Sequence, residues 1–162
     1  MEYGFYRAPW GKLLLIAEDD RLVGLRVRED PGHRDRSENT AKGIESAKEW
    51  LDLYFSGEKP SPKGLKLLLR GSDFQQEVWR ELLQIAYGET MTYGEIAKVI
   101  AKRRGLQRMS SQAVGGAVGR NPIGIIVPCH RVVGSNGSLV GYAGGLEIKR
   151  RLLCHEGVKI GR

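Results

Sequence analysis

The sequence predicts a mixed α/β protein of the α+β kind, with a small sheet domain over residues 1–70 and a helix-turn-helix domain over residues 71–162. Three observations lead to this prediction. The chain has 162 residues, 41% of them hydrophobic and 28% charged, which is an ordinary globular composition. Strand-like apolar runs dominate residues 13–27. Helix-capping patterns followed by apolar residues at helical spacing dominate the second half.

The N-terminal domain is predicted to contain a β-hairpin and one covering helix. The hairpin spans residues 13–27, where an apolar run is followed by an acidic turn and then by alternating apolar and basic residues. The helix spans residues 40–55 and carries apolar residues at helical spacing: Ile44, Ala47, Leu51 and Tyr54. The other predicted segments are a polar loop over 29–37, a linker over 59–64 and a short strand over 65–69.

The C-terminal domain is predicted to contain several helices that begin at recognisable caps. A capping box places a small polar residue at the helix start and a Glu or Gln three positions later. The predicted caps are Asp73 with Gln76, Thr92 with Glu95, and either Ser110 or Ser111. The last of these opens a short helix rich in alanine and glycine, and a further helix is predicted over 146–155. Two helices joined by a basic loop outline a helix-turn-helix, although a glycine-rich packing helix fits the same pattern.

Net positive charge is concentrated in the second half of the chain. The whole sequence carries 26 basic and 19 acidic residues, a formal net charge of +7. Residues 71–162 hold 13 of the basic residues but only 7 of the acidic ones. The stretch 98–131 contains no Asp or Glu. Such a segment attracts phosphates, although a solvated basic face is an equally good interpretation of charge alone.

Several classes of protein are excluded by simple counts. The longest apolar run is five residues, far below the 18 or so that a membrane-spanning helix needs. No secretory signal is visible at the N-terminus. Two cysteines cannot form a disulfide framework or a cysteine-rich metal cluster, so we expect a reducing, intracellular location, the cytoplasm or a eukaryotic nucleus, with no metal and no membrane contact. Cys154 is predicted to be a core or half-buried thiol.

Cys129 and His130 form the candidate chemical centre. A thiol is a strong nucleophile only as the thiolate, and an adjacent imidazole can remove its proton or stabilise the anion. The preceding apolar run, residues 123–127, is predicted to be extended, so a bend or a bridging water would be needed to bring the two groups together. A carboxylate should orient His130, and the candidates are Glu147 and Glu156.

The residues around this pair resemble one protein family. Pro128-Cys129-His130-Arg131-Val132 is similar to the active-site signature of methylated-DNA–protein-cysteine methyltransferases, the O6-alkylguanine-DNA alkyltransferases. Other motifs follow the family's order: Phe74-Gln75, Val78-Trp79, Tyr87-Gly88-Glu89-Thr90, Thr92-Tyr93-Gly94, Ala113-Val114-Gly115, Asn121-Pro122, Gly141-Tyr142, Gly144-Gly145 and His155-Glu156-Gly157. The resemblance implies a ribonuclease-H-like N-terminal domain and a winged-helix C-terminal domain.

The resemblance also implies an activity and its residues. A monomer without a cofactor would bind duplex DNA, flip an O6-alkylguanine out of the stack and transfer the alkyl group to Cys129 once, with O4-alkylthymine as a further candidate substrate. The implied catalytic residues are Cys129, His130, Glu156, Asn121 and Tyr93. The implied DNA contacts are Tyr93, Ser110, Ser111, Gln112, Ala113, Gly115, Arg120 and Arg131. The implied pocket residues are Val132, Tyr142, Ala143 and Gly144.

The sequence departs from the family pattern at two places. Gln112 stands where the family usually has an arginine that replaces the flipped base, which predicts weaker support for flipping. The loop from Ala101 to Met109 is longer than usual and rich in Lys and Arg, which predicts additional phosphate contacts. Two other functions are compatible with these residues: a helix-turn-helix protein that binds DNA or lesions without transferring anything, and a cysteine hydrolase.

Overall fold

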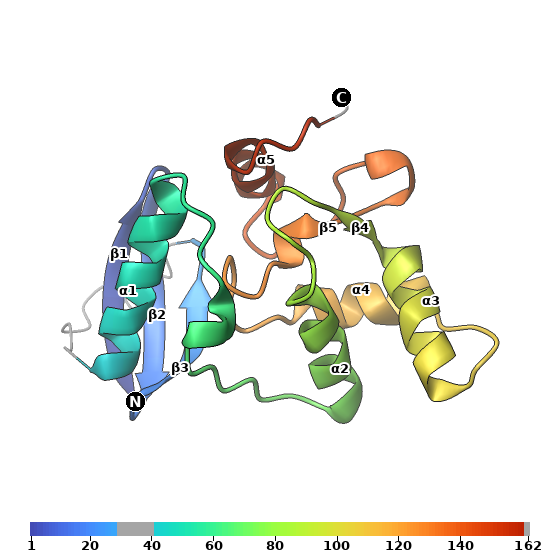
Figure 1. The fold of residues 1–162 in the computed structure, drawn as a ribbon, viewed down its shortest axis with the longest axis horizontal. Helices are drawn as coiled ribbons and strands as arrows, with labels where there is room; N and C mark the ends of the chain where they lie inside the picture. Colours follow the sequence, from blue (N-terminus) through green and yellow to red (C-terminus); the bar gives the residue numbers. More distant parts are fainter. Residues whose placement is uncertain (29–40, 161–162) are drawn as a thin grey trace. The chain divides into compact units, whose positions relative to one another are not determined.

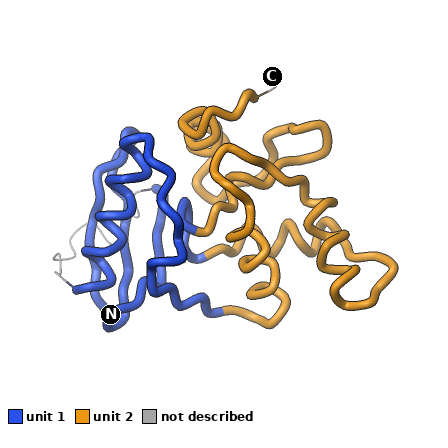
Figure 2. The backbone as a smooth tube through the Cα atoms, in the orientation of Figure 1, with its two compact units in different colours: residues 1–70, 122–126 blue, residues 71–121, 127–162 orange. Residues whose placement is uncertain are grey.

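The computed structural model describes residues 1–28 and 41–160, which form two compact units (Figures 1 and 2). The first unit comprises Met1–Arg70 together with Pro122–Ile126, and the second comprises Gly71–Asn121 and Val127–Arg162. A short segment from late in the sequence therefore belongs to the first unit (blue in Figure 2). The loop predicted over 29–37 lies outside the described residues.

The first unit is built on a three-stranded antiparallel sheet of order β1-β2-β3. Its strands are β1 (Glu2–Ala8), β2 (Gly11–Glu18) and β3 (Arg21–Arg26). The predicted hairpin corresponds to β2 and β3. Strand β1 was not predicted, because Glu2–Ala8 contains no apolar run and mixes aromatic, charged and glycine residues.

Helix α1 (Lys42–Phe55) packs on this sheet (Figure 1), and it confirms the helix predicted over 40–55. Ile44, Ala47, Leu51 and Tyr54 are fully buried, as their spacing indicates. The helix approaches β1 so closely that a Cβ atom added at Gly4 would lie 2.5 Å from Cγ2 of Ile44. Glycine is therefore required at that position by contact with the helix rather than by backbone conformation.

Two further segments contact β3 through single bridges. The main chain pairs Leu22 with Leu67 and Leu25 with Ile123. The strand predicted over 65–69 is thus reduced to one bridge. The prediction of an extended run over 123–127 is wrong. After Ile123 the chain forms a turn, in which Ile125 has a positive φ of 66°. A β-branched residue adopts that conformation at a cost, here within a fully buried position.

The second unit contains four α-helices and one short pair of parallel strands among its described residues. The helices are α2 (Asp73–Leu82), α3 (Tyr93–Arg104), α4 (Ser111–Gly119) and α5 (Leu146–His155). The strands are β4 (Met91–Thr92) and β5 (Val132–Val133). Short 3-10 turns are η2 (Pro62–Gly64) in the first unit, and η3 (Cys129–Arg131) and η4 (Ser135–Gly137) in the second.

The helix caps agree with the predictions except for one shift by a single residue. The capping box of α2 uses Ser72 and Gln75, not Asp73 and Gln76, because the Ser72 hydroxyl accepts from the Gln75 N–H and the Gln75 side chain accepts from the Ser72 N–H. The boxes differ by one position because Ser72 and Asp73 are both good caps. The predicted cap of α3 is confirmed, and Ser110 caps α4.

Helices α2, α3 and α4 pack together around an apolar core (Figure 1). The Trp79 ring is buried, and its Nε1 donates to the Ala117 carbonyl at 2.8 Å, which ties α2 to α4. Gly105, with a φ of 69°, ends α3 in the left-handed conformation that favours glycine. No helix within residues 1–28 and 41–160 is long and apolar enough to cross a membrane.

Candidate active site

Cys129 opens the 3-10 turn η3, which follows Pro128 and bends the chain at the nucleophile. Two hydrogen bonds to a single main-chain carbonyl stabilise this turn. The Val127 oxygen accepts a hydrogen bond from the Cys129 N–H and another from Asn121 Nδ2, both at 2.8 Å. Asn121 therefore braces the cysteine turn, and its side chain also hydrogen-bonds with the thiol.

The Cys129 thiol is buried, with 7% of the residue exposed. Burial raises the pKa of the Cys129 thiol, because a thiolate in a poorly solvated place loses its hydration. Three neighbours act in the opposite direction: the Asn121 side chain, the positive charge of Lys149 and the Tyr142 hydroxyl. The resting group is thus a thiol in a setting that already contains groups able to stabilise its anion.

Glu156, and not Glu147, is the carboxylate that faces His130. Nε2 of His130 lies 2.6 Å from Oε2 of Glu156, and both side chains are fully buried. Glu147 lies on the surface, with 73% of its side chain exposed, and it faces Arg151. Residue types alone left both carboxylates open, whereas the family resemblance implied Glu156, and in the structure Glu156 is the one that contacts His130.

The electrostatics of this pair fix where the imidazole carries its proton. Despite its burial, Glu156 keeps a pKa far below the ordinary value, because His130 and Arg131 both hydrogen-bond to the carboxylate. Burial lowers the pKa of His130, so its ring is neutral. An ionised carboxylate only accepts, so Nε2 carries the hydrogen and Nδ1 keeps its lone pair. Nδ1 is buried and has no hydrogen-bond partner within the described residues.

Arg131 belongs to the interior of this site rather than to a DNA-binding surface. Its Nε donates to Oε1 of Glu156 at 2.8 Å, and its Nη1 donates to the Ile85 carbonyl at 2.7 Å. Only 8% of the residue is exposed. The DNA contact predicted for Arg131 is therefore corrected: its guanidinium neutralises a buried carboxylate, to which the Gly88 N–H also donates at 3.0 Å. The sequence alone does not indicate whether a basic residue next to the Cys129-His130 pair faces the interior or the solvent.

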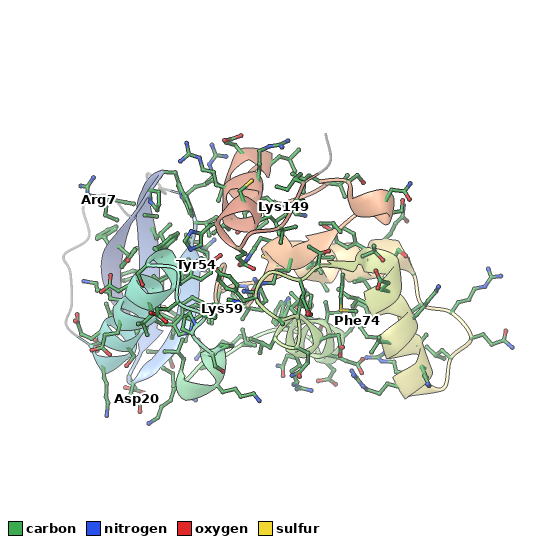
Figure 3. All side chains as sticks on the ribbon, turned by 45° about the horizontal axis from the view of Figure 1, so that its top comes forward. Arg7, Asp20, Tyr54, Lys59, Phe74 and Lys149 are labelled. Atoms are coloured by element: carbon green, nitrogen blue, oxygen red, sulfur yellow. The ribbon has the colours of Figure 1, made fainter. Side chains whose placement is uncertain are left out.

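Lys149 is a residue of the site that the sequence analysis missed. It lies on α5 (labelled in Figure 3), is fully buried, and donates from Nζ to the carbonyls of Val140 and Gly141 at 2.9 and 3.2 Å. Nζ also lies 5.9 Å from the centre of the Tyr93 ring. Burial lowers its pKa to about 8, against a smaller opposing influence of Cys129. The only available signal was its spacing on the helix, in phase with buried Ile148, Leu152 and Leu153.

Comparison with known proteins agrees with this geometry. The family profile described as "6-O-methylguanine DNA methyltransferase, ribonuclease-like domain" matches residues 1–69, and "6-O-methylguanine DNA methyltransferase, DNA binding domain" matches residues 73–158. The chain belongs to the methylated-DNA–protein-cysteine methyltransferase family. This is an enzyme family, and the match confirms the predicted fold class, with a ribonuclease-like first domain and a DNA-binding second domain.

Relatives of this methyltransferase match it over nearly its whole length. The methylated-DNA–protein-cysteine methyltransferase of Methanosarcina acetivorans is 42% identical over 160 residues, covering 97% of this chain and 99% of the relative. That of Mycolicibacterium paratuberculosis is 43% identical, covering 96% and 92%. Among solved structures, Mycobacterium tuberculosis OGT in complex with DNA superposes with a TM-score of 0.80 at 41% identity, covering 97% of this chain and 93% of that one.

Most of the predicted DNA-binding residues of the methyltransferase lie together at the start of α4. Ser110, Ser111, Gln112 and Ala113 are exposed there, and Gly115 is half-buried against the Tyr93 ring. Arg120 is exposed at the other end of the helix. A Cβ added at position 115 would lie 3.8 Å from the Tyr93 ring, which is an ordinary van der Waals contact. Tyr93 itself is half-buried, so the ring links the exposed start of α4 to the neighbourhood of the thiol.

The predicted pocket residues divide by burial. Val132, in β5, and Gly144 are buried, whereas Ala143 is exposed. The Tyr142 hydroxyl is buried and influences the thiol, yet it has no hydrogen-bond partner of standard geometry within the described residues. The prediction that Cys154 is a core or half-buried thiol is wrong, because Cys154 is exposed. No group of three or more His, Cys, Asp and Glu residues in the described chain is placed to hold a metal ion.

Proposed function

We propose that this methyltransferase repairs O6-alkylguanine in duplex DNA by transferring the alkyl group to Cys129, once per molecule. The observation that carries the proposal is the 2.6 Å contact between His130 and Glu156 next to a buried thiol. This arrangement leaves Nδ1 of a neutral imidazole as a base one residue from the nucleophile. Relatives that are 42–43% identical are named for this class of reaction.

Activation of the thiol is the first step of the proposed mechanism. Because burial raises the pKa of the Cys129 thiol, the proton must be removed when the substrate binds. Nδ1 of His130 takes it, through a bridging water, while Nε2 stays bonded to Glu156. The resulting imidazolium is stabilised by the carboxylate, and the thiolate by Lys149 and by the side chain of Asn121.

Transfer is then a single displacement. A sulfur lone pair forms the C–S bond as the bond between the alkyl carbon and O6 breaks, and the released electron pair passes to the guanine. The proton that left the thiol returns to the guanine ring, so the products are S-alkylcysteine and guanine. The Tyr93 hydroxyl donates to a ring nitrogen as negative charge develops there. A thioether is a poor leaving group, which limits each molecule to one reaction.

The alkylated base can reach the Cys129 sulfur only after it has left the stack of the DNA duplex. We propose that the start of α4 enters the minor groove, that Gln112 occupies the space left by the flipped base, and that the other contacts come from Ser110, Ser111, Ala113, Gly115 and Arg120. Val132, Tyr142, Ala143 and Gly144 then line the site of the flipped base. O4-alkylthymine, with the same alkyl–oxygen bond, is proposed as a second substrate. Every proposed group comes from one chain, so a monomer suffices.

Stoichiometry tests the proposal. Increasing amounts of duplex containing O6-methylguanine are incubated with a fixed amount of protein, and restored guanine is counted. The expected plateau is about one equivalent of restored guanine per protein, and Cys129→Ser restores none while still binding the duplex. Repeated turnover would favour the hydrolase, and binding with no restored guanine would favour the DNA-binding protein without transfer.

A further inference from the structure

A groove runs along α3 beside the segment that leads into α4. Its volume is about 460 Å³. Its apolar lining includes Ala97, Ala101, Leu106 and Met109, and its basic lining consists of Lys98, Lys102 and Arg108. All three cations are exposed. None of the catalytic steps above uses this groove.

The basic residues of α3 and of the segment that follows it fall into two groups with different partners. Arg103 and Arg104 bind the carboxylates of α2: Arg103 Nη2 lies 2.8 Å from Oε2 of Glu81, and Arg104 Nε lies 2.7 Å from Oε1 of Glu77. These charges are neutralised within the protein. Lys98, Lys102 and Arg108 have no carboxylate partner within the described residues, and no acidic side chain lines the groove. The groove-lining side of α3, together with Arg108 after the helix, therefore carries positive charge that no carboxylate neutralises within the described residues.

The groove continues into the proposed DNA-binding surface. Ser111, the first residue of α4, lines both. Gly94, near the start of α3, also lines the groove, and a Cβ added there would lie 3.7 Å from the Ser111 hydroxyl. A duplex seated on the start of α4 would thus pass directly beside the groove's cations.

We propose that this groove binds the sugar-phosphate backbone of the DNA duplex next to the flipped-base site, an inference that rests on the proposed function. Lys98 and Lys102 are four positions apart on α3, about 6 Å along its axis, which allows them to contact neighbouring phosphates of one strand. Lysine ammonium groups on flexible stems act as point charges, which suits phosphates better than base edges. The apolar floor suits deoxyribose, whereas a purely electrostatic surface would not need it.

The salt dependence of DNA binding tests this proposal. The triple variant Lys98→Gln, Lys102→Gln, Arg108→Gln is titrated with unmodified duplex at several salt concentrations. Each lost phosphate contact makes the plot of log binding constant against log salt shallower by about 0.9, so a total change of about 2 to 3 is expected. The charge-retaining variant Lys98→Arg, Lys102→Arg, Arg108→Lys is expected to keep the wild-type slope.

A second triple variant controls for the loss of net charge. Arg7, Arg28 and Lys63 are exposed residues of the first unit, and replacing all three by Gln removes the same charge. If the groove variant changes the slope no more than this control, the proposal is overturned, as it would be if the groove served an acidic protein or a lipid surface. Wild-type protein is assayed in parallel for methyl transfer to Cys129. Absence of transfer would overturn the proposed function alone, because the slopes are measured on unmodified DNA.

Discussion

Tyr93 and Lys149 donate hydrogen bonds to the same acceptor, the main-chain carbonyl of Val140. The two distances are 3.1 Å from the Tyr93 hydroxyl and 2.9 Å from Lys149 Nζ. Tyr93 is the first residue of α3 and Lys149 lies in α5, so the segment before Tyr142 is fixed from two elements. In the proposed mechanism the Tyr93 hydroxyl turns to a bound base, and Lys149 would then keep the Val140 carbonyl satisfied.

Replacing Tyr93 by phenylalanine separates its chemical role from its structural one. We expect Tyr93→Phe to lower the single-turnover rate of methyl transfer by about 100-fold, because the ring nitrogen of the leaving guanine loses its donor. The free energy of unfolding should change by less than about 1 kcal/mol, since Lys149 still bonds to Val140. Tyr6→Phe is the control, because its hydroxyl bonds to Asp52 in the first unit. Equal rates for both variants would contradict the role given to Tyr93.

Lys149 makes stability depend on pH in a specific direction. Its pKa is about 8 in the folded protein, below the ordinary 10.5. Between those values the unfolded chain binds a proton that the folded chain does not, so this residue's contribution to the free energy of unfolding rises with pH. We expect wild-type protein to gain stability relative to Lys149→Met between about pH 7.5 and about pH 10, measured by urea unfolding. Titration of the neighbouring Cys129 and Tyr93 occurs in both proteins, and a difference that stays constant would contradict the prediction.

Removing the buried carboxylate should destabilise the fold. Glu156→Gln leaves the Arg131 guanidinium buried without its counter-charge, for which we expect a loss of about 3–5 kcal/mol in the free energy of unfolding. Glu147→Gln is the matched control on the exposed surface of α5, where a change of no more than about 0.5 kcal/mol is expected. Chemical denaturation of both variants measures the two losses in the free energy of unfolding. Similar losses would show that the carboxylate is not the centre of the cluster.

Gln112 offers a gain-of-function test. Because it is exposed at the start of α4 and uncharged, Gln112→Arg should strengthen binding to duplex DNA containing O6-methylguanine, by about tenfold at low salt. Gln84→Arg adds the same charge at an exposed position after α2 and should have a smaller effect. Affinity measured by fluorescence anisotropy compares them. No gain at 112 beyond that at 84 would count against a base-replacing position there.

Much of the fold was predictable because local signals were strong. The spacing of Ile44, Ala47, Leu51 and Tyr54 defined one helix face, and all four are buried. The Thr92–Glu95 capping box marked the start of α3 to the residue. Strand β1 escaped prediction because its stability comes from pairing with β2, which is not a local property. The turn after Ile123 escaped for a similar reason, since the bridge between Ile123 and Leu25 joins residues that are far apart in the sequence. Beyond that bridge the Ile126 N–H donates to the Gly124 carbonyl across Ile125, whose positive φ its side chain disfavours.

The candidate site was predicted as a set of residue types, but their orientations were not. Cys129, His130 and Asn121 follow from the motif and lie together in the structure. The burial of Arg131 and the inward position of Lys149 depend on the partners supplied by Ile85, Glu156 and Val140, which are distant in the sequence or in another element. Sequence spacing places charges on a chain, whereas packing decides which of them face solvent.

Peptide mass spectrometry tests the central claim most directly. The protein is incubated with duplex DNA containing O6-methylguanine and digested, and the peptide that contains Cys129 is compared with the peptide that contains the exposed Cys154. The expected result is a mass gain of one methyl group on the Cys129 peptide, in proportion to the guanine restored, and an unchanged Cys154 peptide. Restored guanine with an unmodified Cys129 peptide would contradict the account.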